Sequence, residues 1–492
     1  MIEQKAKRVV IIGGGISGLS TAWYLQNRAQ EQGIDLKYTL IERADRWGGK
    51  IVSERVETAG KDSFLVEGGP DSFLTQKPWG VNLSGELGIK PNLLGTNDQN
   101  RKVFVLNNGK PTPLPDGVLL IVPTKIKPFA LSSLISPLGK ARMGLDLFIP
   151  ARRDGEDETL ADFIRRRLGS EALDKIAEPL MSGIYNAEAE RQSILATFPR
   201  FRDIETKYGS LIKGMLAASR ARNNGSAPAA KSSLSMFVSF TNGTEELVKE
   251  ILTQLTSDLR LNCGATEVIK NGSRYVVLLE EGDWLEADAI VLAIPAFQSA
   301  ELIHGLSAGA AQKLRAIRYV STGTISMAFR QEELGRLKGF GLVIPRSQKR
   351  AINAVTFSSN KFNHRAPAGY GLLRVFFGGS RSPEMMDLDD SELTSVVERE
   401  LRELLGIEAT PLFQRIYRWH QANPQYDVGH LSHIDALEKE LPGGIFVTGS
   451  PYRGIGIPDC IHQGQQAADK VLVHLAQEDQ ETGNAEPEVA LN

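Results

Sequence analysis

Ten residues near the start of the chain have the types and spacing of a phosphate-binding turn. Residues 9–18 read Val-Val-Ile-Ile-Gly-Gly-Gly-Ile-Ser-Gly, an apolar run followed by glycines in the order Gly-x-Gly-x-x-Gly. Gly13 permits the tight turn, Gly15 lets the backbone approach a pyrophosphate, and Gly18 lets the next helix lie close to the sheet. The free N–H groups and positive dipole end of that helix would face the phosphates. The pattern therefore predicts a strand, a dinucleotide-binding turn and a helix that ends at Gly33.

The residues that follow favour the nucleotide interpretation. Residues 36–41 form a second apolar strand, and Glu42 follows it about 24 residues after the last glycine of the turn. An acid at about 20 residues holds the ribose hydroxyls in dinucleotide-binding folds. Because its charge would oppose a 2′-phosphate, we do not expect NADP. The alternative is a βαβ unit that binds no nucleotide, but strand, glycines, helix, strand and acid all occur in order.

A second glycine-rich element stands near the other end of the chain. Residues 445–448 are predicted to form a short strand, residues 449–460 read Gly-Ser-Pro-Tyr-Arg-Gly-Ile-Gly-Ile-Pro-Asp-Cys, and a helix is predicted over about 461–475. Pro458 suits a first helical turn. The N-terminus of such a helix would stabilise negative charge on a bound ring. Two elements of this kind in one chain predict a composite cofactor site.

Composition excludes several classes of function. The chain has 492 residues and a formal net charge of −2, so nothing in it favours a nucleic-acid partner. Its two cysteines, Cys263 and Cys460, form no metal-spaced cluster, which predicts no metal site and a reduced, cytoplasmic setting. No apolar run approaches the ~20 residues that span a bilayer.

Peripheral contact with a membrane stays open. Apolar stretches near residues 118–135 stand beside four cations, and such a surface could rest on an anionic membrane. Core packing with a solvated basic face is the alternative interpretation. The four cations are Lys125, Lys127, Lys140 and Arg142.

The motifs together resemble the amine oxidase and phytoene desaturase superfamily of flavoproteins. Arg-x-Gly-Gly at 46–49, Glu-Gly-Gly-Pro-Asp-Ser-Phe at 67–73 and the element at 449–460 carry the resemblance. In that superfamily the first turn lies against the FAD pyrophosphate, where N–H groups and a cation meet two negative charges. The second segment passes under the isoalloxazine ring, and the third closes the FAD site.

Further stretches narrow the resemblance to the water-soluble bacterial porphyrinogen oxidases of haem synthesis. They are Glu-Pro-Leu-Met-Ser-Gly-Ile-Tyr at 178–185, Ala-Thr-Phe-Pro at 196–199, Arg-Trp-His at 418–420 and Pro-Gln-Tyr-Asp-Val-Gly-His at 424–430. The resemblance implies oxidation of coproporphyrinogen III to coproporphyrin III, with protoporphyrinogen IX oxidation as the nearest alternative. An amine oxidase or carotenoid desaturase is a more distant alternative, and a flavin-binding partner protein without turnover is the alternative from another class.

The resemblance also implies the plan of the fold, which is α/β (mixed α+β). A Rossmann-like FAD-binding domain is predicted over 1–80, 236–296 and 430–476. An antiparallel-sheet substrate domain is predicted over 81–125 and 297–429, where alternating apolar residues recur. Residues 126–235 are predicted to form an inserted, mostly helical region, and residues 477–492 a disordered tail.

Non-covalent FAD is the expected cofactor. Some amine oxidases attach flavin through a cysteine before the closing motif, whereas Cys460 lies after it. For Trp419, a buried core indole with a bonded N–H is the alternative to a flavin contact. Family roles at matching positions assign FAD contacts to Gly13, Gly14, Gly15, Ile16, Ser17, Gly18, Glu42, Arg43, Gly48, Gly49, Lys50, Gly69, Pro70, Asp71, Ser72, Val268, Trp419, Ile455, Gly456 and Ile457.

The implied chemistry suits a flavin. Pyrrole nitrogen lone pairs can push a hydride from a meso carbon to flavin N5, after which a pyrrole N–H loses its proton. Full aromatisation removes six electrons, so three flavin cycles are needed, each closed by oxygen with hydrogen peroxide as product. Because the substrate supplies the electron push, we expect no catalytic side chain, and the protein contributes positioning and water exclusion.

Substrate and partner contacts follow from the same resemblance. The substrate's propionates predict cations at the pocket mouth. Lys77 is the candidate because the family places a substrate-contacting lysine there, and a solvated lysine is the alternative. Ile184 and Tyr185 are candidates for packing against a pyrrole. Transient contact with ferrochelatase and a peripheral position on the inner face of the cell membrane are further expectations.

Overall fold

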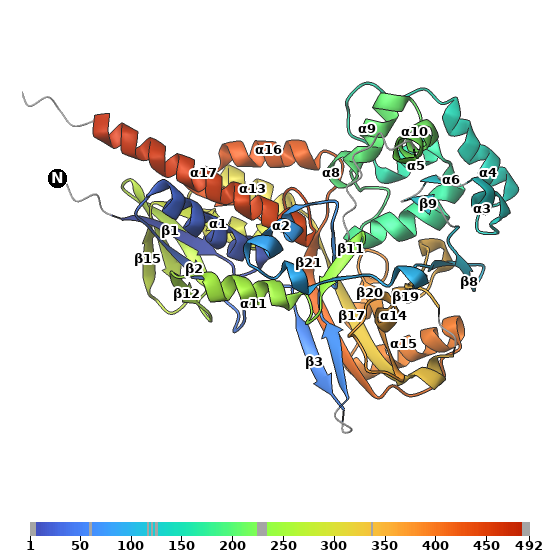
Figure 1. Cartoon of the computed structure of the whole chain (residues 1–492). Coiled ribbons are helices and arrows are strands. Elements are labelled where there is room, and N and C mark those ends of the chain that lie inside the picture. Colours follow the sequence, from blue (N-terminus) through green and yellow to red (C-terminus); the bar gives the residue numbers. More distant parts are fainter. Residues whose placement is uncertain are drawn as a thin grey trace, which may run out of the picture.

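The structure is a computed structural model that describes residues 6–58, 62–115, 118–119, 122–123, 126–223, 234–335 and 338–484. Figure 1 shows three regions: a parallel sheet flanked by helices, a larger sheet below it, and a helical lobe. The last helix continues to Asn484, so residues 477–484 are helical and that part of the predicted disordered tail is wrong. A helix already formed adds one hydrogen bond per residue, and Gln and Glu are good helix formers. Residues 485–492 lie outside the described residues.

The first region is built on a five-stranded parallel sheet in the order β12-β2-β1-β16-β22. All of its pairings are parallel, and helices cover both faces, so β1, β16 and β22 contain continuous apolar runs. The strands predicted at 9–12, 36–41 and 445–448 are confirmed. The bounds are β1 (Lys7–Ile12), β2 (Leu36–Ile41), β12 (Asp258–Arg260), β16 (Ala289–Leu292) and β22 (Ile445–Val447).

Alternate residues of β1 enter two separate cores, because successive side chains of a strand point to opposite faces. Val9 and Ile11 pack with the first and last long helices, whereas Val10 and Ile12 pack with the helices after β16. On the first face lie α1 (Ile16–Gln32), α2 (Trp79–Glu86), α11 (Glu245–Gln254) and α17 (Ile457–Asn484). On the second lie α12 (Ala296–Ile303), α13 (Ala308–Ala316) and α16 (His430–Glu440).

Two predicted domain boundaries differ from this packing. The boundary at residue 80 falls inside α2, whose Leu83 belongs to the core of α1 and α17. The boundary at 296 separates β16 from α12 and α13, yet Ala300 and Leu314 of those helices share its core. In both places the apolar face of a helix packs back on the parallel sheet, which the strand pattern alone does not reveal.

The second region is a seven-stranded sheet in the order β21-β17-β20-β19-β18-β7-β8. Its pairings are antiparallel, as predicted, except for the parallel pair β18 and β7. The apolar face of the sheet packs on α15 (Asp390–Leu405), seen beside it in Figure 1. The bounds are β7 (Val103–Asn107), β8 (Lys110–Pro113), β17 (Tyr319–Arg330), β18 (Gly341–Val343), β19 (Ile352–Phe357), β20 (Tyr370–Gly378) and β21 (Phe413–Pro424).

The described residues also form four small sheets. Their strands are β3 (Ser53–Glu57) with β4 (Ser63–Glu67); β5 (Phe73–Leu74), β11 (Phe237–Phe240) and β6 (Leu93–Gly95); β9 (Val118–Leu119) with β10 (Val122–Pro123); and β13 (Ala265–Asn271), β14 (Arg274–Leu279) and β15 (Trp284–Ala287). Short helical turns are η1 (Lys90–Asn92), η2 (Asp98–Asn100), η3 (Leu145–Leu147), η5 (Gln331–Leu334), η6 (Arg346–Gln348), α14 (Ser358–Lys361) and η7 (Pro383–Met386).

The third region is a helical lobe, which agrees with the mostly helical region predicted over 126–235 as far as residue 223; residues 224–233 lie outside the described residues. One of its segments, over residues 173–182, is π-helical. The elements are α3 (Ile126–Leu131), α4 (Pro137–Gly144), α5 (Leu160–Arg167), α6 (Ser170–Ala172), η4 (Leu173–Ser182), α7 (Gly183–Tyr185), α8 (Ile194–Thr197), α9 (Pro199–Tyr208) and α10 (Leu211–Asn223).

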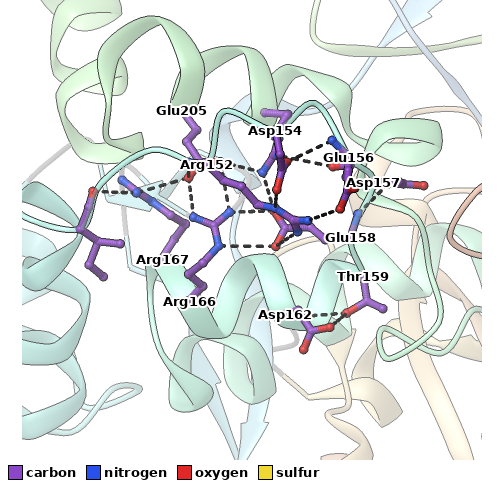
Figure 2. A network of polar contacts seen from close by, with 12 residues as sticks. Arg152, Asp154, Glu156, Asp157, Glu158, Thr159, Asp162, Arg166, Arg167 and Glu205 are labelled. Carbon is purple, nitrogen blue, oxygen red and sulfur yellow. Dashed lines mark hydrogen bonds and ion pairs between the residues drawn. The ribbon is translucent and has the colours of Figure 1, made fainter.

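A network of ion pairs joins α5, α9 and the loop before α5 inside this lobe (Figure 2). Arg167 and Asp146 are fully buried and lie 2.6 Å apart. Glu205 accepts hydrogen bonds from Arg167 and Arg202, and Arg202 also binds Glu158 at 2.6 Å. Because loss of one partner would leave a buried charge uncompensated, the network fixes the arrangement of these elements.

The lobe is attached to the end of β21. The Ser193 N–H donates to the Tyr426 carbonyl at 2.8 Å, and the Val428 N–H donates to the Arg191 carbonyl at 3.0 Å. Asp157 accepts hydrogen bonds from the Ser193 hydroxyl at 2.6 Å and from the Gly429 N–H at 2.9 Å. These contacts fix α7 and α8 against the segment that precedes α16.

Candidate cofactor and active site

The turn between β1 and α1 has the shape that the glycine spacing predicted. Gly13 has a φ of 111°, and a Cβ on Gly18 would lie 1.9 Å from the Gly13 carbonyl oxygen, so α1 lies directly against the turn. A Cβ on Gly15 would meet no protein atom within 4 Å. The first turn of α1 has no side-chain cap and no acid. The space beside Gly15 is therefore open at a helix N-terminus that favours a phosphate.

Glu42 stands beside this turn at the end of β2. Its carboxylate accepts the Gly14 N–H at 2.7 Å and the Ala44 N–H at 2.9 Å. The acid predicted for the ribose thus lies next to the dinucleotide turn. Arg43 has another partner: it pairs with Glu280 at 2.6 Å, with more than half of its side chain exposed. Its contact with FAD stays a prediction that this geometry does not favour.

Arg46, which our assignment of site residues did not include, fixes the second glycine-rich turn. Its guanidinium donates to the carbonyls of Trp47 and Ile51 at 3.3 Å and to that of Gly49. The signal was in the sequence, because Arg46 begins the Arg-x-Gly-Gly turn. The turn itself meets the first one, since the Gly48 N–H donates to the Gly14 carbonyl at 2.8 Å.

The next glycine-rich segment packs on this second turn. A Cβ on Gly69 would lie 1.7 Å from the carbonyl oxygen of Lys50, so only glycine allows the approach. The Lys50 amine donates to the Ala422 carbonyl, and surrounding protein atoms lower its pKa by desolvation although the residue is exposed. Pro70 accepts a hydrogen bond from the Thr244 hydroxyl at 3.0 Å. The segment is held from both sides.

Asp71 and Ser72 complete that segment. Asp71 lies 2.8 Å from the Lys361 amine and accepts a hydrogen bond from the Ser72 hydroxyl at 2.7 Å. Burial alone would raise the pKa of Asp71, but the cations Lys361 and Arg374 hold it far below its ordinary value. Asp71 is therefore charged and fixed, which does not suit a general base.

The N–H of Trp419 is bonded, but its side chain is only half-buried, so it is not the buried core indole of the alternative interpretation. Its indole N–H donates to the Gly68 carbonyl at 2.9 Å, and a Cβ on Gly68 would lie 2.6 Å from the ring of Tyr417. The indole is thus bonded within the protein, at the edge of the segment that includes Gly69. Its contact with FAD stays a prediction.

The closing element brings the end of the chain to the same place. Ile455, Gly456 and Ile457 lead into α17, which packs on α1 so closely that a Cβ on Gly464 would lie 2.7 Å from the Ser17 carbonyl oxygen. Ile16 and Ser17 are buried at this contact. The helix predicted at 461–475 begins four residues earlier than expected, so the glycines lie at its N-terminus.

Cys460 and Val268 are both buried in the protein core. Cys460 is buried in α17, and burial raises the pKa of its thiol to about 11, so the thiol stays neutral and poorly nucleophilic. This agrees with non-covalent FAD. Val268 lies on β13, 1 % exposed, in the core that contains Ile12 and Ile41 at the carboxyl ends of β1 and β2.

These four segments, residues 13–18, 48–50, 68–72 and 454–457, form what we name the glycine cradle. The first three meet through close backbone contacts, and the fourth leads into α17, which packs on α1. The open space beside Gly15, the free helix N-terminus and the neighbouring acid match a pyrophosphate followed by a ribose. The residues present therefore fit a dinucleotide cofactor. Within the described ranges, no three His, Cys, Asp or Glu residues gather to hold a metal ion.

The predicted substrate residues lie near the cradle, but not all are free. The Lys77 amine is paired with Asp459 in the first turn of α17 at 2.6 Å. Tyr185 is buried, with its ring centroid 5.9 Å from Phe198 and 5.7 Å from Tyr426, in a cluster that Ile455 also joins. Ile184, which precedes it, is 54 % exposed. Tyr185 therefore packs against the segment 454–457, on which it forms a buried aromatic wall.

His430 has a structural role at this wall. Its ring stacks on Tyr426 at a centroid distance of 4.0 Å, and Nε2 lies 2.8 Å from the Tyr452 carbonyl oxygen. Burial lowers the pKa of His430 to about 4, so the ring is neutral. Nε2 of His433 lies 2.8 Å from the Lys313 carbonyl oxygen. Both histidines therefore bond backbone carbonyls and have structural roles.

Comparison with known proteins agrees with this geometry. The family model for flavin-containing amine oxidoreductases matches residues 16–472. Coproporphyrinogen III oxidase of Bacillus subtilis is 35 % identical over 95 % of this chain and 98 % of its own, and chloroplastic protoporphyrinogen oxidase of Oryza sativa is 31 % identical over 95 % and 88 %. A crystal structure of a candidate protoporphyrinogen oxidase from Exiguobacterium is similar with a TM-score of 0.83, 30 % identity and coverage of 96 % and 100 %.

The matched region includes all the segments of the glycine cradle except the first residues of its leading turn. A flavin bound at a dinucleotide turn is FAD, so the cofactor predicted from the sequence is confirmed. None of the helices in the described part of the chain is long and apolar enough to cross a bilayer. The fold, the cradle and the match over 16–472 together show that this chain belongs to the flavin-containing amine oxidoreductase family.

Proposed function

We propose that the protein is an FAD-dependent coproporphyrinogen III oxidase that forms coproporphyrin III for haem biosynthesis. The observation that carries the proposal is the relationship to the Bacillus subtilis enzyme of that name, which extends over nearly the whole of both chains. Oxidation of protoporphyrinogen IX is the second candidate, favoured by the relationship to the plant enzyme. Both candidates use the same cradle and differ in the number of propionates that the site must accept.

The chain's own residues would orient the cofactor and exclude water. When bound, FAD accepts two electrons in each of three rounds and passes them to oxygen. The carboxylates nearest Gly69 are already engaged, because Glu67 accepts hydrogen bonds from Ser53 at 2.6 Å and Thr244 at 3.0 Å, and Asp71 is paired with Lys361. Neither carboxylate is free to act as a base. The pyrrole N–H of the substrate would therefore lose its proton without help from either of these side chains.

Substrate contacts remain part of the proposal. Lys77 would meet a propionate at the edge of the cradle, since its side chain is about two-fifths exposed despite the pair with Asp459. Ile184 would pack on a pyrrole from its exposed position, and Tyr185 would support the closing element from behind. Product transfer to ferrochelatase would follow release.

We also propose peripheral contact with the anionic inner face of the cell membrane, from a cytoplasmic position. Four large apolar side chains of α3, α4 and the following turn are exposed on the lobe: Leu131, Leu138, Leu145 and Phe148. Lys127 is exposed beside them, and Lys125 lies outside the described residues. Lys140 and Arg142 instead donate to backbone carbonyls of the lobe. The apolar side chains therefore supply most of the proposed contact.

Anaerobic bleaching of the flavin tests the proposed reaction. Each porphyrinogen is added to the purified yellow protein, and the flavin absorbance is followed in a stopped-flow instrument. Faster bleaching by coproporphyrinogen III than by protoporphyrinogen IX would support the first candidate, and the reverse order would support the second. Dithionite provides the control, because it reduces any bound flavin. A flavin that dithionite bleaches and neither porphyrinogen bleaches would contradict the proposal, and simple amines would be tried next.

A further inference from the structure

Arg374 is a buried cation directly behind the glycine cradle. It lies on β20, opposite Ser326 of β17 and Thr356 of β19, and is only 5 % exposed. One guanidinium nitrogen, Nη2, donates to the Gly69 carbonyl at 2.5 Å. Its Nε has no hydrogen-bond partner among the described residues. A buried arginine that is not fully hydrogen-bonded destabilises the folded protein. Such a residue is therefore a candidate for a functional role.

The face of the sheet that carries Arg374 differs from the opposite one. Val375 and Phe377 point into the apolar core that α15 covers. Arg374 alternates with them and points to the other face, which packs on the segment 67–72. On the neighbouring strand Thr324 has the same orientation by register, and its buried hydroxyl also lacks a partner among the described residues.

The charges around this segment do not cancel. Lys361 is paired with Asp71. Arg365 lies 3.7 Å from Glu67, and the side chains of Arg365 and Glu67 are both buried. With Arg374 there are three cations and two carboxylates, which leaves one positive charge. Burial also raises the pKa of Glu67, which favours its neutral form and enlarges the excess.

Two further charges, on β3 and β21, form a pair of their own. Glu54 on β3 binds Arg415 on β21 at 2.7 Å and also accepts a hydrogen bond from the Tyr417 hydroxyl. The pair is neutral and more exposed than the cluster behind Gly69. It therefore does not supply the negative charge that would balance Arg374.

We propose that Arg374 is a positioning and electrostatic residue that stabilises negative charge on the bound flavin and so raises its reduction potential. The inference rests on the proposed placement of the isoalloxazine ring over Gly69. Preorganised charge in a water-poor site acts strongly, because the surrounding medium screens it weakly. The hydrogen bond to Gly69 would fix the segment, and the charge would favour the electron-rich form of the ring.

Sulfite binding to the oxidised holoenzyme tests the electrostatic part. Sulfite donates its electron pair to flavin N5, so an S–N bond forms and the ring becomes anionic. Arg374→Gln keeps a hydrogen-bond donor and removes the charge, whereas Arg374→Lys keeps the charge and loses the planar fork. We expect a rise of about tenfold in the sulfite Kd for Arg374→Gln and less than threefold for Arg374→Lys. A tenfold change in a two-electron equilibrium corresponds to about 30 mV, which a dye-coupled titration of the flavin potential would measure.

The matched control is Arg415→Gln, which removes an arginine from the same sheet at a half-buried position. We expect its sulfite Kd to stay within threefold of the parent value. Asp71→Asn gives a second test of opposite sign that does not depend on the folding of Arg374→Gln: removal of a carboxylate enlarges the positive excess, and sulfite should bind more tightly. An unchanged Kd in Arg374→Gln, or weaker binding in Asp71→Asn, would overturn the inference. Neither readout uses a porphyrinogen, so a failure of the proposed reaction would be seen separately.

Discussion

Lys77 and Asp459 join two segments of the candidate site. The Lys77 amine lies 2.6 Å from Oδ1 and 2.7 Å from Oδ2 of Asp459, and Oδ2 also accepts the Gly456 N–H at 3.3 Å. The lysine after the flavin segment is thus connected to the N-terminus of α17. It neutralises the one acid of that first turn, where a negative charge would otherwise oppose an electron-rich ring.

Replacement of Lys77 by methionine separates substrate binding from cofactor binding. A charge-assisted contact with a propionate contributes about 1.5 kcal/mol or more, so we expect Lys77→Met to raise the Michaelis constant about tenfold. The FAD content should not change, because Lys77 is not part of the glycine cradle. Steady-state kinetics and the flavin-to-protein absorbance ratio measure the two quantities. Asp459→Asn is the control that keeps the lysine, and an unaltered Michaelis constant in Lys77→Met would remove it from the pocket.

Two glycines of the first turn should respond differently to alanine. A Cβ on Gly18 collides with the Gly13 carbonyl, so Gly18→Ala should destabilise the apoprotein by roughly 1–3 kcal/mol. A Cβ on Gly15 meets no protein atom, so Gly15→Ala should leave the apoprotein stable and weaken FAD at least tenfold through contact with the pyrophosphate.

Denaturant unfolding of the apoproteins and FAD titration by fluorescence quenching measure the two effects. Gly33→Ala would not serve as a control, because Gly33 has a φ of 66°. Gly183→Ala does serve, since its Cβ meets nothing within 4 Å and its φ is not positive. Wild-type FAD affinity in Gly15→Ala would show that the open space is not the pyrophosphate position.

His430 should make stability fall in mild acid. Its pKa is about 4 in the folded protein and about 6.5 in an unfolded chain. Between these values the unfolded chain binds the proton more strongly, so the free energy of unfolding decreases as pH falls below about 6.5. The loss between pH 7.5 and pH 5 is on the order of 2 kcal/mol. Urea unfolding at both pH values, compared with His430→Gln, would measure it. An equal pH dependence in the two proteins would assign the loss to other groups.

The exposed side chains of the lobe predict binding to vesicles. Leu138 is 84 % exposed and Phe148 is 81 % exposed, and burial of two such side chains contributes more than 2 kcal/mol. The double variant Leu138→Ser with Phe148→Ser should therefore sediment with phosphatidylglycerol vesicles at least tenfold less well than the parent. Trp284→Ser is the control, because Trp284 is 58 % exposed on β15, far from α4 in Figure 1. Equal sedimentation of all three proteins would show that the lobe does not bind the membrane.

The parts of the site that the sequence predicts are those fixed by local backbone geometry. The residues from Gly13 to Gly18 and the acid Glu42 lie in one βαβ unit, where spacing determines position. The same holds for the strand at 445–448 and the helix after it. Arg46 shows the limit of motif matching: the turn was identified, but the arginine that bonds its carbonyls was not singled out.

Residues that meet only through the fold gave no local signal. Arg374 binds the carbonyl of Gly69 across 305 positions of the chain, and nothing in the alternating pattern of β20 marks it. The pair of Lys77 and Asp459 likewise depends on how α17 returns to α1. The lobes and sheets were predicted correctly as types, whereas the helices α12 and α13 were assigned to the wrong side of a boundary because packing, not periodicity, decides it.

The contact of α1 with α17 has a consequence for how the enzyme is made. Gly464 can touch Ser17 only after all the residues between them have left the ribosome. Until then the nascent protein lacks the segment 454–457 of the cofactor site, and the preceding part of the chain folds without a complete site for FAD. Loading of the flavin is a late event, and fragments interrupted before α17 should accumulate colourless.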